Sequence, residues 1–188
     1  MPVLVPTAPA LPDLDVPTPA PEPVPDRPPA APGRNAGADR ATTLLTFGDR
    51  MLRAGNLARA EERYRQALKA DPGAARPRLR LAQVAVARGD YHEAAVRFRE
   101  GYAADPDWVL RAEDVESLWS EPRRFGALLG KIESHLVAHP EDRDGWLVLG
   151  AELLLSGRKD RAADVFLRLT DRPPDALLTT FLDASQAG

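Results

Sequence analysis

Three histidines are the residues best suited to metal chemistry, and two of them, His135 and His139, lie four positions apart. On a helix this spacing places both rings on one face, where they could bind one metal ion. Leu136 follows the first histidine, where the metalloprotease signature has glutamate. A structural role is favoured, because His135 falls on an apolar helix face and His139 at a helix end, where positive charge suits the dipole. We therefore expect no metal site.

No other side chains form a recognisable reactive set. The chain has no cysteine, so disulfides and thiolate metal sites are excluded. Neighbouring carboxylates such as Glu61 and Glu62 are typical of a solvated helix face, and Glu61 with Arg65 has the spacing of a helix-supporting ion pair. Phosphate-binding, dinucleotide-binding, serine-hydrolase and kinase motifs do not occur. The sequence therefore predicts a non-enzymatic protein without a cofactor.

The net charge and the length of the apolar runs exclude further classes of partner. The 188 residues carry a net charge of -3 and a pI near 5.7, which argues against nucleic acid as a partner. Apolar runs fall short of the roughly 20 residues that span a bilayer, and no basic start precedes an apolar core. We expect a cytoplasmic location by default, with cell-envelope association if the N-terminus is truncated. Richness in Ala, Arg and Pro suggests a bacterial genome, and the oligomeric state is left open.

Residues 1–38 differ in composition from the rest of the chain. Twelve of the 19 prolines fall between Pro2 and Pro32. Proline fixes φ and has no N–H, so we expect a disordered, extended tail with polyproline II character. We favour a semi-rigid spacer. The alternative is a docking ligand for an aromatic groove, since Pro6 with Pro9 and Pro25 with Pro28 fit the PxxP spacing.

From residue 39 onward, a period of 34 residues organises the sequence. Prolines recur in step, and so do a large side chain eight residues before each proline and, in three of four copies, alanine four residues earlier still. These sets are Pro72, Pro106, Pro140 and Pro174; Tyr64, Phe98, Ile132 and Phe166; and Ala60, Ala94, Leu128 and Ala162. The chain therefore divides into repeats 41–74, 75–108, 109–142 and 143–176.

Each repeat is expected to fold as two helices, A and B. Gly55, Gly89 and Gly157 have the position of a turn that ends helix A, because glycine readily adopts positive φ. Asn56 and Asp90 then start helix B as N-caps. Small residues at the crossing let the two helices approach closely, and the large side chain fills the space beside them.

The third repeat departs from this pattern. Glu116 stands at a position where a small residue is expected, and Arg123 replaces the turn glycine directly after Pro122. We expect a short or tilted helix over residues 110–119 and a regular amphipathic helix over 125–139. After the fourth repeat, Asp175 can start a last helix, and residues 177–188 are expected to cap the open end of the stack.

The fourth repeat carries the family signature. Trp146, Leu149 and Gly150, then Ala162, Phe166 and Pro174, resemble the tetratricopeptide repeat pattern, with Leu153 in place of its tyrosine. The resemblance implies an all-α, right-handed α-solenoid of about four helix-turn-helix repeats over residues 39–188, with a C-terminal capping helix. It also implies a concave groove, lined by A helices, that binds a peptide or partner protein.

The resemblance also implies groove positions within each A helix. Transferred to this chain, they give a partner-binding groove of Leu45, Asp49, Arg53, Arg76, Leu79, Arg80, Gln83, Leu147, Val148 and Ala151. Leu45 and Asp49 stand where the chaperone-tail clamp of the family has lysine and asparagine, so that ligand is not expected. Arginines among apolar residues favour an acidic-apolar segment as the ligand. The alternative is that these arginines only solvate the surface.

Two functions stay open from the sequence. The first is a non-catalytic scaffold or adaptor that binds a protein partner in the groove. The second is a regulatory or assembly-helper domain of a larger enzyme or cell-envelope protein, with the proline-rich segment as the interdomain linker.

Overall fold

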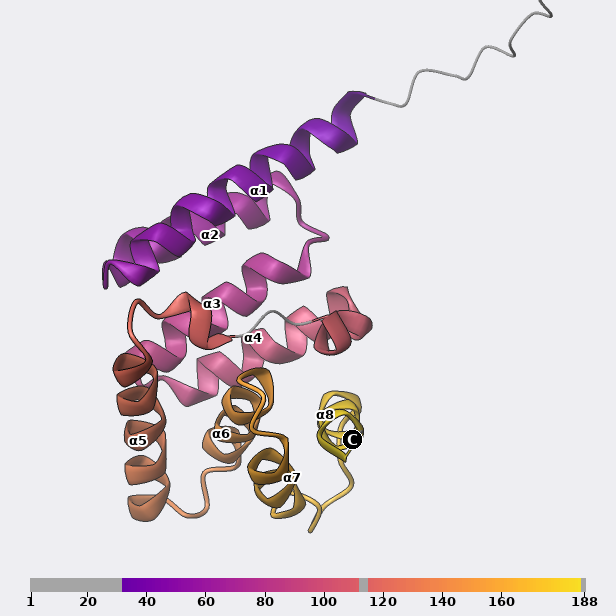
Figure 1. Cartoon of the computed structure of the whole chain (residues 1–188). Coiled ribbons are helices and arrows are strands. Elements are labelled where there is room, and N and C mark those ends of the chain that lie inside the picture. Colours follow the sequence, from indigo (N-terminus) through magenta and orange to yellow (C-terminus); the bar gives the residue numbers. More distant parts are fainter. Residues whose placement is uncertain (1–31, 112–114, 187–188) are drawn as a thin grey trace, which may run out of the picture. The chain divides into compact units, whose positions relative to one another are not determined.

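In repeats 1, 2 and 4, the turn between the two helices falls where the repeat pattern places it. The computed structural model describes residues 32–111 and 115–186, and the prediction for the tail over residues 1–31 lies outside them. Eight α-helices and two 3₁₀ helices make up this part, and it contains no strand (Figure 1). They are α1 Pro32–Arg53, α2 Leu57–Ala70, α3 Ala75–Arg88, α4 Tyr91–Ala104, η1 Pro106–Arg111, η2 Val115–Leu118, α5 Pro122–Ala138, α6 Arg143–Leu155, α7 Lys159–Leu167 and α8 Ala176–Gln186.

The tail boundary expected at residue 38 is too late, because α1 already begins at Pro32. Proline is well tolerated in the first turn of a helix, where its missing N–H would have no partner. No further proline occurs before Pro72, so nothing interrupts the helix once it has started. The first helix of repeat 1 is therefore 22 residues long.

The turn chemistry follows the sequence closely. Gly55, Gly89 and Gly157 have φ values of 77°, 80° and 76°, and among the described residues no other residue type has positive φ. Asn56 Oδ1 accepts from the Arg59 N–H at 3.3 Å and Asp90 Oδ1 from the Glu93 N–H at 3.0 Å. These contacts confirm the predicted glycine turns and N-caps.

The predicted small-residue crossings also occur. A Cβ added at Gly48 would lie 2.3 Å from a ring carbon of Tyr64, and one at Gly150 would lie 2.2 Å from Phe166. Ala162, on the other helix of the fourth repeat, is fully buried. Only glycine fits at these two glycine positions, because the ring from helix B lies directly against the glycine backbone.

In the third repeat, the described residues of the A half form no α-helix. Two 3₁₀ helices, η1 and η2, occupy the span where a short or tilted helix was expected, whereas α5 forms as predicted. Glu116 is half-buried and accepts a hydrogen bond from Arg158 at 3.0 Å, instead of lying at a tight helix crossing. Helix α6 packs directly against α4 as well as against α5.

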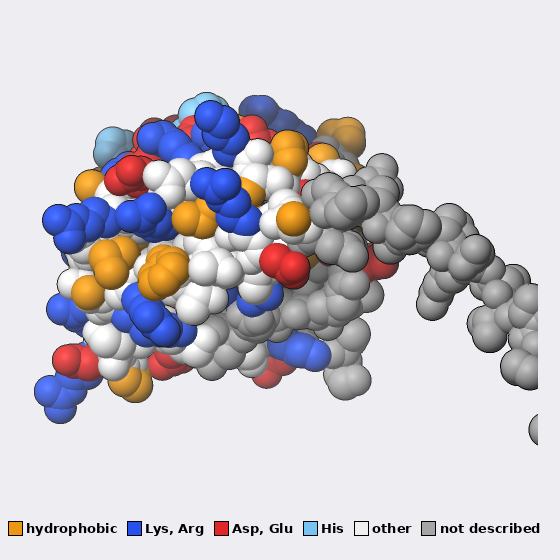
Figure 2. Space-filling model, turned by 90° about the horizontal axis from the view of Figure 1, so that it is seen from above, with side chains coloured by type: hydrophobic (Ala, Val, Ile, Leu, Met, Phe, Trp, Pro, Cys, Tyr) orange, Lys and Arg blue, Asp and Glu red, His pale blue; other side chains and the backbone are white. Residues whose placement is uncertain are grey.

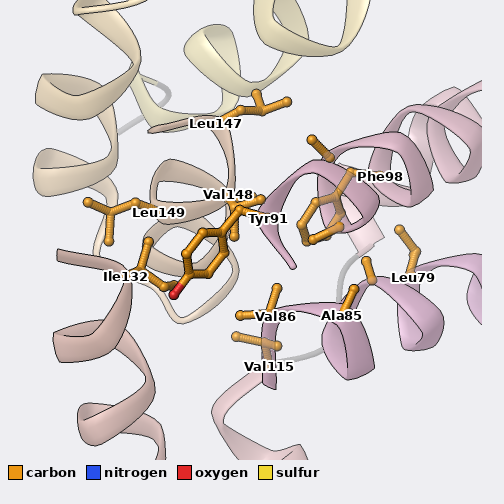
Figure 3. Packing of buried hydrophobic residues seen from close by; sticks show 14 of the residues in the cluster. Leu79, Ala85, Val86, Tyr91, Phe98, Val115, Ile132, Leu147, Val148 and Leu149 are labelled. Atoms are coloured by element: carbon orange, nitrogen blue, oxygen red, sulfur yellow. The ribbon is translucent and has the colours of Figure 1, made fainter. Parts of the chain in front are cut away.

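The last helix does more than end the stack. Asp175 caps α8 by accepting from the Leu178 N–H at 2.8 Å, as predicted. The ring of Phe181 then lies 5.3 Å from that of Phe166, 6.4 Å from Phe98 and 6.0 Å from Trp108, measured between centroids. Helix α8 thus packs against η1 and α6 in addition to α7, and one apolar core joins repeats 2 and 4 (Figures 1 and 3).

Candidate functional site

Most of the predicted groove residues are buried in this structure. Seven of the ten have little exposed surface: Leu45, Leu79, Arg80, Gln83, Leu147, Val148 and Ala151. Asp49 is partly buried, and Arg53 and Arg76 are exposed. The groove stays a prediction, and the burial of these seven side chains follows from three sets of contacts within the chain.

The first set holds Arg80. Its Nε donates to Asp49 Oδ1 at 3.0 Å, and the same oxygen accepts from the Tyr64 hydroxyl at 2.8 Å. Burial, together with the Asp49 carboxylate, raises the pKa of Tyr64 above its ordinary range, so the phenol stays protonated and donates. The guanidinium of Arg80 thus neutralises a carboxylate of its own chain and joins α1 to α3.

The second set of contacts joins α3 to α6, a helix from the C-terminal half of the chain. Gln83 Nε2 donates to Glu152 Oε1 at 2.6 Å, which joins α3 to α6, and both side chains are buried. Burial raises the pKa of Glu152 to about 8, although the hydrogen bond from Gln83 acts in the opposite direction. Near neutral pH this carboxyl is therefore mostly protonated. Gln83 Oε1 and Glu152 Oε2 are buried and have no hydrogen-bond partner.

The third set comes from the irregular third repeat. Helix η2 packs against α1 and α6, with Val115 and Leu118 buried. Figure 3 shows Val115 beside Val86 of α3. The Arg53 Nε donates to the Ser117 carbonyl at 3.4 Å. A segment of the chain itself therefore lies along the helices to which the family pattern assigns a groove.

The groove residues of the fourth repeat pack inside the core. Leu147, Val148 and Ala151 belong to α6, which lies against both α4 and α5. Figure 3 shows Val148 next to the ring of Tyr91 at the start of α4, with Ile132 of α5 on the other side of that ring. These residues serve packing in this structure.

The histidines take structural positions. His135 Nε2 lies 2.7 Å from Asp142 Oδ2, and its ring lies 4.8 Å from that of Tyr91. Burial would raise the pKa of Asp142, but hydrogen bonds from the Gly145 N–H and from His135 lower it below its ordinary value. Asp142 caps α6, so His135 orients a helix cap. Within the described ranges, no three His, Asp or Glu side chains form a metal-binding group.

A different surface, on the outer side of α1 and α2, combines apolar and basic side chains. Two adjoining hollows of about 770 and 410 Å³ lie there, and both are lined by Leu44 and Arg63. Phe47 is 45% exposed, which is unusual for a large apolar residue in this chain. We call this surface the N-terminal face, with lining residues Ala36, Gly37, Arg40, Leu44, Phe47, Met51, Arg59, Glu62, Arg63, Gln66, Lys69 and Ala70.

The view onto α1 in Figure 2 agrees with this description. Lys and Arg side chains alternate with exposed apolar side chains over much of the surface, and Asp and Glu are fewer. Four basic side chains and one acidic one line the N-terminal face. Arg50 also lies 5.6 Å from the centroid of the Phe47 ring, in cation–π geometry.

The sequence pattern contained a signal for this surface. Leu44, Phe47, Gly48 and Met51 have the spacing of one helix face, the face through which the first A helix packs. Gly48 is covered, by Tyr64 of the same hairpin. Phe47, in contrast, is 45% exposed, and no repeat precedes α1 among the described residues.

Comparison with known proteins agrees with the repeat pattern. Residues 51–114 match the family described as tetratricopeptide repeat, from the end of α1 through the second repeat and into the third. None of the curated proteins matches the chain significantly. No helix of the described residues has the length and apolar character needed to cross a membrane.

Proposed function

Because this chain is a tetratricopeptide repeat protein, we propose that it is a non-catalytic scaffold or adaptor that binds a partner protein through its repeats. Repeats of this family generally mediate protein–protein interaction. One observation carries the proposal for this chain: the N-terminal face is hollowed and exposes apolar side chains, among them Phe47, which is 45% exposed. Exposed apolar surface of this kind is typical of interaction sites.

The proposal moves the contact surface away from the groove that the family pattern suggests. The groove positions of α1, α3 and α6 are largely occupied by contacts within the chain, including the Gln83–Glu152 and Arg80–Asp49 hydrogen bonds. A ligand there would have to break these buried contacts, which costs free energy. The N-terminal face needs no such rearrangement.

Affinity capture with the full chain as bait tests the function. Proteins retained from a lysate of the source organism would be identified, purified and titrated against the chain by calorimetry. We expect at least one to form a stoichiometric complex, and the Phe47→Glu bait to lose it while Val137→Glu keeps it. Val137 is 85% exposed on α5 and serves as the matched control. If no purified candidate binds the chain, the proposal is refuted.

A further inference from the structure

The N-terminal face has counterparts inside the molecule, and their coverage shows what fits it. In repeats 2 and 4, residues 7 and 11 of the repeat are buried on the side of the preceding helices. In repeat 2 these are Leu81 and Ala85, 6% and 4% exposed, and in repeat 4 Leu149 and Leu153, 4% and 1% exposed. In repeat 1 the same positions hold Phe47, 45% exposed, and Met51, partly exposed.

A helix covers each of the internal counterparts. Helix α2 packs on α3, where Glu61 and Arg65 of α2 share the lining of a small hollow with Leu81 and Ala85. In repeat 4, α4 and α5 pack on α6, and Figure 3 shows Ile132 of α5 facing Leu149. The repeat geometry thus presents a seat for one more helix at each hairpin.

The dimensions of the N-terminal face agree with a helical occupant. Its apolar lining on α1 runs from Gly37 through Leu44 and Phe47 to Met51, with residues three to seven apart on one side of the helix. At 1.5 Å per residue this stripe is about 20 Å long, which corresponds to roughly four turns of a docked helix. Among the described residues no helix precedes α1, and an exposed apolar stripe of this kind is typical of an interaction site.

The charges of the face select the kind of helix. In repeat 2, Arg97 is flanked on its own helix by Glu93 and Glu100, at 2.8 and 2.7 Å. The equivalent residue of repeat 1 is Arg63, and Arg59 and Gln66 stand where those two glutamates would be. Arg63 donates to Gln66 at 2.8 Å, which leaves its charge without a carboxylate on either side.

Further basic residues make the N-terminal face more positively charged than the equivalent surface of repeat 2. Arg40 on α1 and Lys69 on α2 line the same surface, and Glu62 is the single acidic residue among its lining side chains. An acidic partner would gain electrostatic complementarity, and a basic one would be repelled. The internal precedent has the same chemistry, because Glu61 of the docked helix α2 bonds Arg88 of α3 at 2.5 Å.

We propose that the N-terminal face binds an amphipathic helix of about four turns from a partner protein, with an apolar stripe flanked by Asp or Glu, seated as α2 is seated on α3. This inference rests on the proposed interaction function and specifies its surface and its partner class. Leu44, Phe47 and Met51 supply the apolar contact, and Arg40, Arg59 and Arg63 supply the cations.

The test uses designed peptides and the full chain. A fluorescein-labelled 15-residue helical peptide carries a leucine stripe flanked by glutamates, and a second peptide replaces every glutamate with lysine. By fluorescence anisotropy we expect the glutamate peptide to bind at least tenfold more tightly than the lysine peptide. Phe47→Glu and Arg63→Glu should each weaken its binding at least tenfold, and 0.5 M salt should weaken it as well.

Matched controls separate the face from general charge effects. Val137→Glu and Arg123→Glu place the same new charges at exposed positions of α5, and binding of the glutamate peptide should not change. Arg63→Glu should also improve binding of the lysine peptide, a reversal that simple unfolding cannot produce. Circular dichroism of each variant reports that the helices are retained.

Several outcomes would overturn the inference. Equal affinity for the two peptides, or unchanged affinity in Phe47→Glu, would show that the face does not select an acidic helix. Phe47-dependent sedimentation with phosphatidylglycerol vesicles, or a Phe47-dependent dimer by analytical ultracentrifugation, without peptide binding, would assign the face to a membrane or to a second copy. If the peptides fail while a purified captured partner still binds Phe47→Glu, the interaction function stands and this surface assignment fails.

Discussion

At the scale of single residues, the glycines at the helix crossings show how closely sequence and packing are linked. Gly150 has no room for a methyl group beside Phe166, whereas a Cβ at Gly126 on α5 would meet nothing within 4 Å. Both glycines lie inside helices, where alanine has the better intrinsic propensity by roughly 1 kcal/mol. The same substitution should therefore have opposite effects at the two sites.

We expect Gly150→Ala to lower the free energy of unfolding by about 1–3 kcal/mol, because the new methyl group forces the Phe166 ring out of place. Gly126→Ala should raise it by up to about 1 kcal/mol. Urea unfolding followed by circular dichroism measures both. Destabilisation by Gly126→Ala, or stabilisation by Gly150→Ala, would contradict the observed helix crossing.

Glu152 makes the second prediction at this scale. Its pKa in the folded chain is raised to about 8 by burial, from an ordinary value of 4.5. The folded state therefore holds a proton that the unfolded state has lost, so this residue makes stability fall as pH rises from about 4.5 through 8. Glu152→Gln keeps the shape and removes the titration.

We expect Glu152→Gln to be more stable than the parent at pH 8.5 and to lose this advantage progressively toward pH 5. Thermal unfolding midpoints measured across that range give the difference between the two proteins. Glu116→Gln, which changes a half-buried carboxylate paired with Arg158, is the control and should not reproduce the profile. A constant difference between Glu152→Gln and the parent at every pH would exclude a raised pKa.

At the scale of elements, the third repeat determines how the others meet. Its A half forms η1 and η2 in place of an α-helix, and η2 lies against α1 and α6 with Leu118 only 2% exposed. Helix α6 then contacts α4 directly. The irregular segment therefore acts as a packing element between hairpins, which a shortened helix in a regular stack would not do.

Leu118→Asp tests this role. A carboxylate at this buried position should lower the free energy of unfolding by about 3 kcal/mol or more, through lost apolar burial and the cost of burying a charge. Ser120→Asp, two residues later at an exposed position beside Arg124, should change stability little. Chemical denaturation compares the two. Similar small effects would mean that η2 contributes nothing to the packing.

At the scale of the whole described unit, one aromatic cluster joins repeats that are distant in sequence. Phe181 of α8 lies within 6.4 Å, between ring centroids, of Phe98 in α4 and of Phe166 in α7. An ideal repeat stack has contacts only between neighbouring repeats. Here the last helix also contacts η1, so removal of the Phe181 ring should destabilise both repeat 2 and repeat 4.

We expect Phe181→Ala to lower the free energy of unfolding by about 3–5 kcal/mol. Amide exchange measured by mass spectrometry should then be faster in α4 as well as in α7 and α8. Val137→Ala, at an 85% exposed position, should leave exchange unchanged. Faster exchange confined to α8 would show that this helix is only an end cap, as the sequence suggested.

The sequence by itself determined every feature that depends on neighbours along the chain. Turn glycines, N-caps, small residues opposite rings and the 34-residue period are set by local sterics and by contacts within one hairpin. The all-α repeat fold and the weakness of the third repeat were therefore predictable. The start of α1 was not, because a dense run of prolines obscured the tolerance for Pro32 at a helix N-terminus.

Only the tertiary structure decided which predicted binding residues are accessible. The family pattern assumes that every A helix forms. In this structure the described A half of repeat 3 forms 3₁₀ helices, and α6 contacts α4 and is hydrogen-bonded to α3. Gln83 of α3 is a buried partner of Glu152 of α6, and Arg80 of α3 is a buried partner of Asp49 of α1. Exposure of Phe47 likewise depends on whether another helix lies beside it, and that is a property of the assembled repeats that no local pattern contains.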